Sequence, residues 1–171
     1  MTRGIRPVPI ASCAFLLAVA ACSSAVLTGP PSLRLGHDEC AECGMIVSDE
    51  KFSCALLLEE DTQRSYAVYD DIGCLLDDER DGLDKRSVIE RYVHDADSHQ
   101  WVRAEEAFYL VSDSQSMQTP MGSGIAAFAE RSKADAAKVR YDGRVLPWNE
   151  LAPARRDWME KRHGKSAKQG D

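Results

Sequence analysis

The sequence lacks the features of several common protein classes. Its 171 residues carry 21 Lys and Arg against 28 Asp and Glu, and the net charge of −7 argues against a nucleic-acid partner. The same balance argues against electrostatic adhesion to an anionic bilayer. There is no phosphate-binding glycine loop, no dinucleotide-binding glycine pattern and no Ser/His/Asp arrangement. The length suits one domain of ordinary size or two small ones.

A membrane-spanning hydrophobic run is also lacking, since such a run needs about 20 apolar residues. The apolar stretch from Ile10 to Ala21 is shorter and follows Arg3 and Arg6, which indicates a signal peptide over residues 1–21. Small residues lead into Cys22, as in bacterial lipoprotein signals. Acylation there would anchor the mature protein stably, because several acyl chains act together. The alternative is an ordinary secreted protein with a chance cysteine.

The residues after Cys22 refine the predicted location. Ser23 and Ser24 follow it without an Asp, a pattern that favours the outer membrane in Gram-negative bacteria. We therefore expect the protein at the periplasmic face of the cell envelope, lipid-anchored at Cys22. Cleavage removes two arginines and Cys13, so the net charge of the mature chain becomes −9. Four free thiols remain, at Cys40, Cys43, Cys54 and Cys74.

The mature chain divides into a tether, a folded domain and a tail. We expect the tether over residues 22–34, the folded domain over residues 35–164 and a fraying tail over residues 165–171. We expect the domain to consist of two halves with a similar order of elements, at about residues 35–97 and 98–164, although their sequence similarity is too weak to prove a repeat. The predicted fold class is α+β, with two related ββαβ halves and a C-terminal helix.

Hydrophobic periodicity predicts the elements of each half. In the first half we expect strands over residues 52–58, 64–69 and 88–93 and a helix from residue 72 to about 81. Asp70 and Asp71 precede this helix, where carboxylates cap free amides; a carboxylate pair for acid–base chemistry is the less favoured interpretation. In the second half we expect strands over residues 101–102, 108–112 and 143–146, a helix over 125–138, and a last helix after Asn149.

Soft ligand residues carry the chemical signal. Cys40, Cys43 and Met45 lie within six residues, and Gly44 permits a tight turn between them. Thiolate and thioether ligands select Cu(I) over hard cations. Met121, with Met117 four residues before it, lies in a polar Pro/Gly loop that is a poor place for core residues. Core packing is the ordinary alternative for each methionine.

Further residues are weaker candidates for the same site. His37 stands three residues before Cys40 and could supply an extra ligand. Cys74 falls at the start of a predicted helix, and its role stays open. Cys54 falls within a predicted strand, where a buried thiol behaves as a small hydrophobe. In an oxidising envelope the four thiols could instead pair, and the sequence does not choose the pairs.

Two other functions compete with copper binding. Cys40 and Cys43 could form the redox pair of a periplasmic thiol–disulfide oxidoreductase, although such pairs usually stand at a helix N-terminus and here strand-like residues follow. A structural zinc module would use the cysteines without needing methionine.

Several motifs together resemble the NosL family, the accessory lipoproteins of nitrous oxide reductase. They run in family order from Cys40 to about Leu151 and cover most of the mature chain. The matching motifs are Cys40-x-x-Cys43-Gly-Met45 with Ile46 to Glu50, Tyr69 to Leu75, Trp101-Val-x-Ala104 with Ala107-x-Tyr109, Pro120 to Phe128, and Gly143 to Leu146.

The resemblance implies two related ββαβ halves and a periplasmic Cu(I) chaperone without catalytic turnover. Its copper would serve the copper–sulfur centre of nitrous oxide reductase, through a membrane-bound ABC-type maturation complex. Carried over by motif, the ligands are Cys43, Met45 and Met121, with Cys40 matching the first cysteine of the motif.

Overall fold

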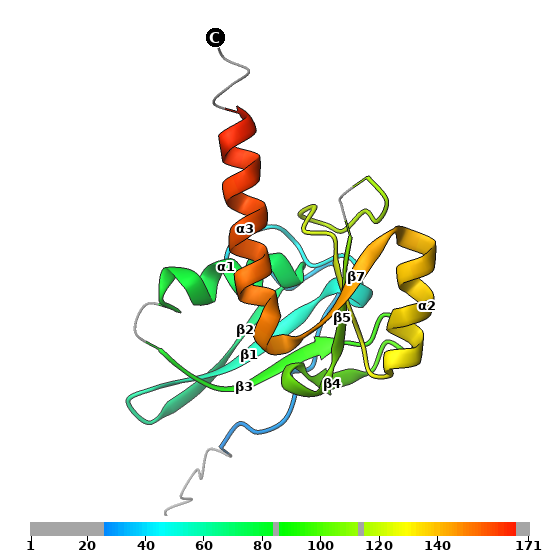
Figure 1. Ribbon diagram of the computed structural model, residues 1–171. Coiled ribbons are helices and arrows are strands. Elements are labelled where there is room, and N and C mark those ends of the chain that lie inside the picture. The colour runs from blue at the N-terminus through cyan, green and yellow to red at the C-terminus, as the bar shows by residue number, and fades with distance from the viewer. Residues whose placement is uncertain (1–25, 84–85, 113–114, 167–171) are drawn as a thin grey trace, which may run out of the picture.

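Two small antiparallel sheets organise the chain in the computed structural model, which describes residues 26–83, 86–112 and 115–166 (Figure 1). The elements are η1 (Glu50–Phe52), β1 (Cys54–Glu60), β2 (Gln63–Tyr69), α1 (Ile72–Asp81), β3 (Ser87–His94), β4 (Trp101–Arg103), η3 (Ala104–Glu106), β5 (Phe108–Ser112), β6 (Ile125–Phe128), α2 (Arg131–Tyr141), β7 (Gly143–Pro147) and α3 (Trp148–Ser166).

The two sheets share one topology. The first has the strand order β2-β1-β3-β4 and the second β6-β5-β7, so in each half the first strand of the unit lies between the second and the third. Each unit places its helix between its second and third strands. The predicted α+β class with two related ββαβ halves and a C-terminal helix is confirmed.

The predicted helix over residues 125–138 is wrong in its first turn. Residues 125–128 form β6, which pairs antiparallel with β5, and α2 starts only at Arg131. Ala127 also makes a parallel bridge to Asp95, and its carbonyl accepts a hydrogen bond from Ala96 at 2.8 Å. Backbone partners on both sides, together with burial of all four residues, favour a strand over the helix that alanine prefers.

The strand predicted at residues 101–102 also has an unexpected partner. It forms β4, whose residues Trp101 to Arg103 pair with His94 to Tyr92 of β3 in the first sheet. The second unit therefore takes β5 and β6 as its first two strands, while β4 extends the first sheet across the predicted boundary near residue 97.

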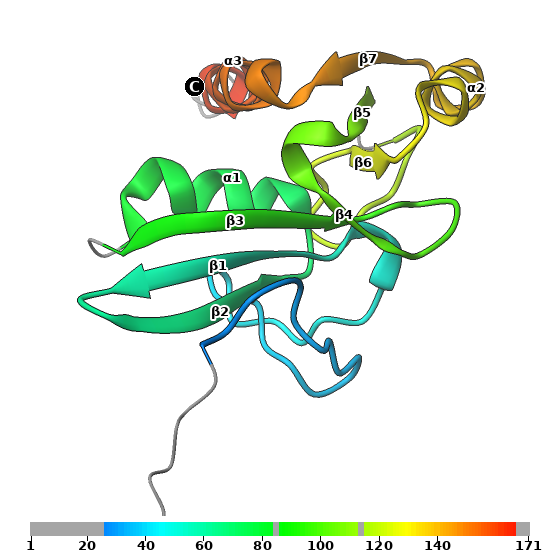
Figure 2. The same cartoon turned by 90° about the horizontal axis from the view of Figure 1, so that it is seen from below.

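A continuous core joins the two halves. Leu56 and Leu58 of β1 pack with Ile72 and Leu75 of α1, and the same cluster includes Tyr109 of β5. Burial of each such side chain contributes roughly 1.5–3 kcal/mol. Figure 2 shows α1 on one side of the first sheet and the segment before β1 on the other, which explains why five consecutive residues of β1 are buried.

The chain termini differ in part from their predicted roles. The residues at 27–29 contact the fold, since Arg64 donates to the Leu27 carbonyl at 3.0 Å and Tyr66 to the Gly29 carbonyl at 2.8 Å. At the other end α3 continues through Ser166, into the predicted tail. The predicted signal peptide, Cys22 and residues 167–171 lie outside the described residues. Within the described ranges, no helix has the length and apolar character needed to cross a bilayer.

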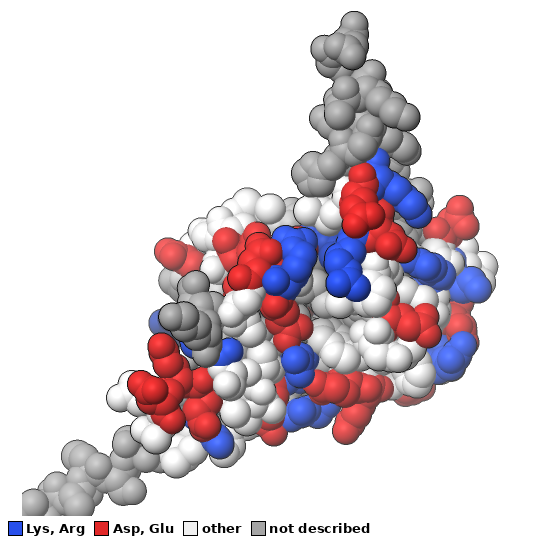
Figure 3. All heavy atoms as spheres, turned by 60° about the vertical axis from the view of Figure 1, so that its left-hand side comes forward, with Lys and Arg blue, Asp and Glu red and all other residues white. Residues whose placement is uncertain are grey.

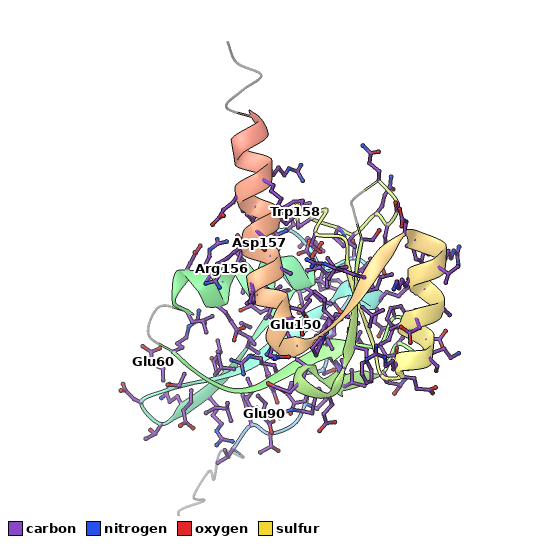
Figure 4. The ribbon with its side chains drawn as sticks, viewed as in Figure 1. Glu60, Glu90, Glu150, Arg156, Asp157 and Trp158 are labelled. Atoms are coloured by element: carbon purple, nitrogen blue, oxygen red, sulfur yellow. The ribbon has the colours of Figure 1, made fainter. Side chains whose placement is uncertain are left out.

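α3 connects the halves at the surface. Its residues Leu151 and Ala154 are buried in the shared core, and Arg155 pairs with Asp77 of α1 at 2.7 Å. Figure 4 shows Arg156 on the side of α3 toward α1 and Trp158 toward the second half. On the face that carries α1, acidic and basic side chains lie next to one another (Figure 3).

His94 predicts a pH dependence of stability. It is 2% exposed, its Nδ1 lies 2.7 Å from the Ser53 hydroxyl and its ring stacks on Trp101. Burial lowers the pKa of His94 below its usual value. Because the unfolded chain then binds the proton more readily, stability is full above the unfolded pKa of about 6.5 and falls as the pH drops below it.

Urea unfolding of the protein between about pH 7.5 and 5.5 tests this, because that range brackets the ordinary histidine pKa of about 6.5. We expect the free energy of unfolding of the parent to fall by up to about 1.4 kcal/mol per pH unit, and that of His94→Gln to depend less on pH. Parallel profiles for the two proteins would contradict this assignment.

Candidate metal centre

Three thiols and one carboxylate converge at the end of the first sheet. The sulfur atoms of Cys40, Cys43 and Cys74 and a carboxylate oxygen of Asp70 all lie within 4.8 Å of one another. Cys40, Cys74 and Asp70 are buried, and Cys43 is half-buried. The Cys43 thiol faces an Asp70 oxygen at 3.8 Å. This geometry could hold one metal ion with ligands from two separate segments, the loop of Cys40 and Cys43 and the turn of Asp70 and Cys74.

A tight loop presents Cys40 and Cys43. The Cys40 amide donates to the Met45 carbonyl at 2.7 Å, and the Gly44 amide donates to the Cys40 carbonyl at 2.9 Å. Gly44 has a φ of 74°, a left-handed conformation that glycine adopts without strain. The Ala41 amide donates to the Val68 carbonyl of β2 at 2.8 Å, which fixes the loop beside the end of that strand.

The junction between β2 and α1 supplies the other two groups. Asp71 is the N-cap of α1, and its side chain accepts from the Gly73 amide at 2.7 Å, as predicted for this acidic pair. Asp70 does not share the capping role, and its side chain joins the thiols instead. Cys74 lies in the first turn of α1, where its amide donates to the Asp71 carbonyl at 3.0 Å.

The cluster favours one thiolate. A hydrogen bond from Cys74 lowers the pKa of Cys40 to about 5 despite burial. The same hydrogen bond and burial raise the pKa of Cys74. Burial raises the pKa of Cys43 to about 11, and burial, with a hydrogen bond to Cys40, raises the pKa of Asp70 to about 6. A bound cation would displace the remaining protons, because metal ligands bind in their deprotonated form.

The two principal methionine candidates lie beside the segments that carry the cluster. Met45 follows directly on the cysteine loop and is 53% exposed. Met121 is 39% exposed, and its amide donates to an Asp71 oxygen at 3.0 Å, next to Asp70. The second half thus contributes a thioether-bearing loop to the side of the first half where the thiols lie.

The other candidates lie elsewhere. His37 is exposed and is outside the group of convergent ligand atoms among the described residues. Met117 is buried in the core of the second half with Leu110 and Phe128, the ordinary fate of a methionine. Cys54 is fully buried in the shared core, as expected, and burial raises its thiol pKa. The predicted lipidation site Cys22 lies outside the described residues.

Sequence reasoning gave too little weight to Asp70 and Cys74. Both were visible as part of the run Asp70-Asp71-Ile72-Gly73-Cys74 at a predicted helix start. Cysteines in the first turn of a helix are frequent functional thiols, and this position could have marked Cys74 even though the hydrogen bond to Cys40 and burial raise its pKa here. The approach of the cysteine loop to this turn depends on the contact between Ala41 and Val68, which no local pattern encodes.

Comparison with known proteins agrees with these motifs. The family model described as NosL matches residues 34–155, well over half of the chain. The chain belongs to the NosL family. A relative described as "Copper-binding lipoprotein NosL", from Stutzerimonas stutzeri, is 30% identical over 126 residues. The match covers 68% of this NosL chain and 63% of that relative, so the chain spans under two thirds of the relative's length.

A solved structure shares the fold of this NosL chain. It is described as the crystal structure of the copper chaperone NosL from Shewanella denitrificans. The TM-score is 0.51 at 23% sequence identity, and the match covers 71% of this chain and 96% of the other. At this identity the likeness supports the fold, while the chemistry depends on the residues of this chain.

Native alkylation tests the geometry of the thiols. Because Cys43 is half-buried and Cys54 is completely buried in the core, we expect iodoacetamide to modify Cys43 before Cys54 and to spare Cys54 in the folded, metal-free protein. Peptide mass spectrometry after timed quenching gives the rate at each cysteine. The same reaction in concentrated guanidinium chloride is the control, in which all four thiols react. Equal rates for Cys43 and Cys54 in the folded protein would contradict the structure.

Proposed function

We propose that this NosL-family chain is a Cu(I) carrier that binds and releases copper without catalytic turnover. The single observation that carries the proposal is the convergence of three thiols with Asp70 within 4.8 Å. Soft sulfur ligands select Cu(I), which accepts low coordination numbers. The two relatives, a copper-binding lipoprotein and a copper chaperone, support the same metal.

In this proposal the half-buried Cys43 is the central ligand. The buried thiols of Cys40 and Cys74 bind from the protein interior, and the thioethers of Met45 and Met121 bind from the solvent side. The thiols supply affinity, because the attraction between a thiolate and a metal cation is strong where water is excluded. The thioethers are neutral and partly exposed, so they bind more weakly and can exchange with an acceptor. A carrier needs both properties, since copper must be held against small thiols and still be released.

We propose delivery at the cell envelope. Two observations support a protein anchored at the periplasmic face of the membrane: the lipoprotein signal at Cys22 and the similarity to a lipoprotein from Stutzerimonas stutzeri. The residues after Cys22 favour the outer membrane. The family motifs support nitrous oxide reductase as the client, reached through its membrane-bound ABC-type maturation complex. Transfer of Cu(I) from the loaded carrier to the copper-depleted reductase in the presence of that complex tests this client.

Zinc is the second candidate, and Asp70 is the observation that favours it. Three cysteines and one carboxylate make a four-ligand set of the kind that Zn²⁺ accepts in tetrahedral sites. A zinc module would not need Met45 or Met121 and would unfold on chelation.

The thiol–disulfide alternative uses only Cys40 and Cys43, which lie in a loop closed by the bridge between Glu39 and Ile46. It predicts disulfide reductase activity in metal-free protein.

Anaerobic Cu(I) titration of ligand variants tests the carrier. Competition with a coloured Cu(I) chelator gives the affinity of the parent and of Cys43→Ser, Cys74→Ser and Met121→Leu. We expect the largest loss in Cys43→Ser, a clear loss in Cys74→Ser, and about a tenfold or greater loss in Met121→Leu, equivalent to about 1.4 kcal/mol or more. The same series titrated with Zn²⁺ should leave Met121→Leu unaffected, because a thioether adds little for zinc.

Matched controls separate lost ligands from lost packing. Met117→Leu makes the same change as Met121→Leu at a methionine buried in the second core, and Cys54→Ala removes a thiol from the shared core. Both should bind Cu(I) like the parent. Unchanged Cu(I) affinity in Cys43→Ser and Met121→Leu would contradict the proposed ligand set. Tighter binding of Zn²⁺ than of Cu(I) by the same sulfur atoms would favour the zinc module.

A further inference from the structure

One buried carboxylate connects the cysteine half to the methionine half. Asp71 is 0% exposed and uses both of its oxygens. Oδ1 accepts from the Gly73 amide at 2.7 Å and so caps α1. Oδ2 accepts from the Thr119 hydroxyl at 2.7 Å and from the Met121 amide at 3.0 Å. The cap therefore requires only one oxygen, and the second reaches a loop that lies 48 and 50 residues further along the chain.

The loop that receives Asp71 is itself closely held. The Gly124 amide donates to the Thr119 hydroxyl oxygen at 3.2 Å, and the Gly122 amide donates to the Thr119 carbonyl at 3.0 Å. Thr119 thus connects Asp71 to the backbone that follows Met121. A side chain at this position without a hydroxyl would break both the link to Asp71 and the link to Gly124.

The first turn of α1 is shaped to accept this loop. A Cβ atom on Gly73 would lie 2.6 Å from the Ser123 Cβ, closer than packed atoms allow. Only glycine therefore lets the Met121 loop approach the turn that carries Cys74. The close approach and the Asp71 contacts act on the same two segments, and both fix the loop relative to the thiols.

We propose that Asp71 is a positioning residue for copper, which holds the Met121 backbone in register with the Cys40, Cys43 and Cys74 thiols. This rests on the proposed Cu(I) function and extends it to a residue that does not touch the metal. A buried carboxylate that accepts three hydrogen bonds is satisfied and rigid, so it limits the movement of the loop. Without it, Met121 would have to be ordered at the moment of copper binding, at a cost in affinity.

Asp71→Asn tests this role in a double-mutant cycle with Met121→Leu on the full chain in detergent. The Asn oxygen can still accept from Gly73 and cap α1, but the amide N–H₂ then faces the Met121 N–H, donor against donor. We expect Cu(I) affinity to fall about tenfold in Asp71→Asn alone, as for other residues that orient metal ligands. In the Met121→Leu background Asp71→Asn should cause no further fall, because the ligand it positions is gone.

Asp49→Asn is the matched control, because Asp49 caps η1 through the Lys51 amide at 3.1 Å. It should leave Cu(I) affinity unchanged in both backgrounds. Thr119→Val gives a second route that keeps the α1 cap intact, and it should weaken Cu(I) binding only when Met121 is present. The urea midpoint of every variant is recorded, so that a general loss of stability is seen separately.

Three outcomes overturn the inference. If the losses from Asp71→Asn and Met121→Leu add in full, Asp71 acts on stability or on another ligand and does not position Met121. If Asp71→Asn fails to fold and Thr119→Val binds Cu(I) as the parent does, the anchor has no role in copper binding. If Met121→Leu alone leaves affinity unchanged, both the proposed ligand set and this inference fail, whereas a loss in Met121→Leu with full additivity overturns the inference alone.

Discussion

The burial of several ionisable groups in one place is the constraint on which the site depends. Cys40, Cys74 and Asp70 are almost completely removed from water, and Cys43 is half-buried beside them. The pKa values of the thiols therefore separate: a hydrogen bond from Cys74 lowers the pKa of Cys40 to about 5, whereas burial raises the pKa of Cys43 to about 11. A soft monovalent cation relieves this constraint, because it replaces protons and neutralises charge at the same atoms.

The duplicated fold explains how such ligands come together. Each half is a ββαβ unit. The first half supplies its thiols from the loop before β1, which docks beside the end of β2, and from the first turn of α1. The second unit contributes the loop between β5 and β6, which carries Met121 and is held to α1 through Asp71. Thiols therefore come from one half and a thioether from the other. In the proposed carrier, this division would place the thiols in a buried interior and the thioether at an exposed edge of the site.

The sequence predicted the elements that local pattern determines. β1, β2, α1, β3, β5 and β7 fall close to their expected places, since their apolar residues alternate or recur with clear periods. β6 was mistaken for a helix because a short apolar run, Ile125 to Phe128, has no period of its own, and its pairing with β5 and Ala96 is a tertiary contact. The strand at residues 101–102 was assigned to the wrong half for the same reason, because nothing in Trp101 to Arg103 specifies which neighbouring strand it pairs with.

The candidate site follows the same division between local and long-range information. The spacing of Cys40, Cys43 and Met45 in one loop is a local signal, and this loop carries two of the three clustered thiols. Asp70 and Cys74 join the cluster only because the loop docks on Val68, and Met117 proved to be a core residue despite its polar surroundings in sequence. A local pattern can mark such residues as candidates, but only the tertiary contacts decide which of them share one site.

The central claim is that copper binds to the sulfur atoms of this cluster. X-ray absorption at the copper edge of the Cu(I)-loaded protein measures the first ligand shell directly. We expect a shell of sulfur alone in the parent, with fewer sulfur neighbours in Cys74→Ser and in Met121→Leu. A first shell made mainly of nitrogen or oxygen, or one that neither variant changes, would contradict the account.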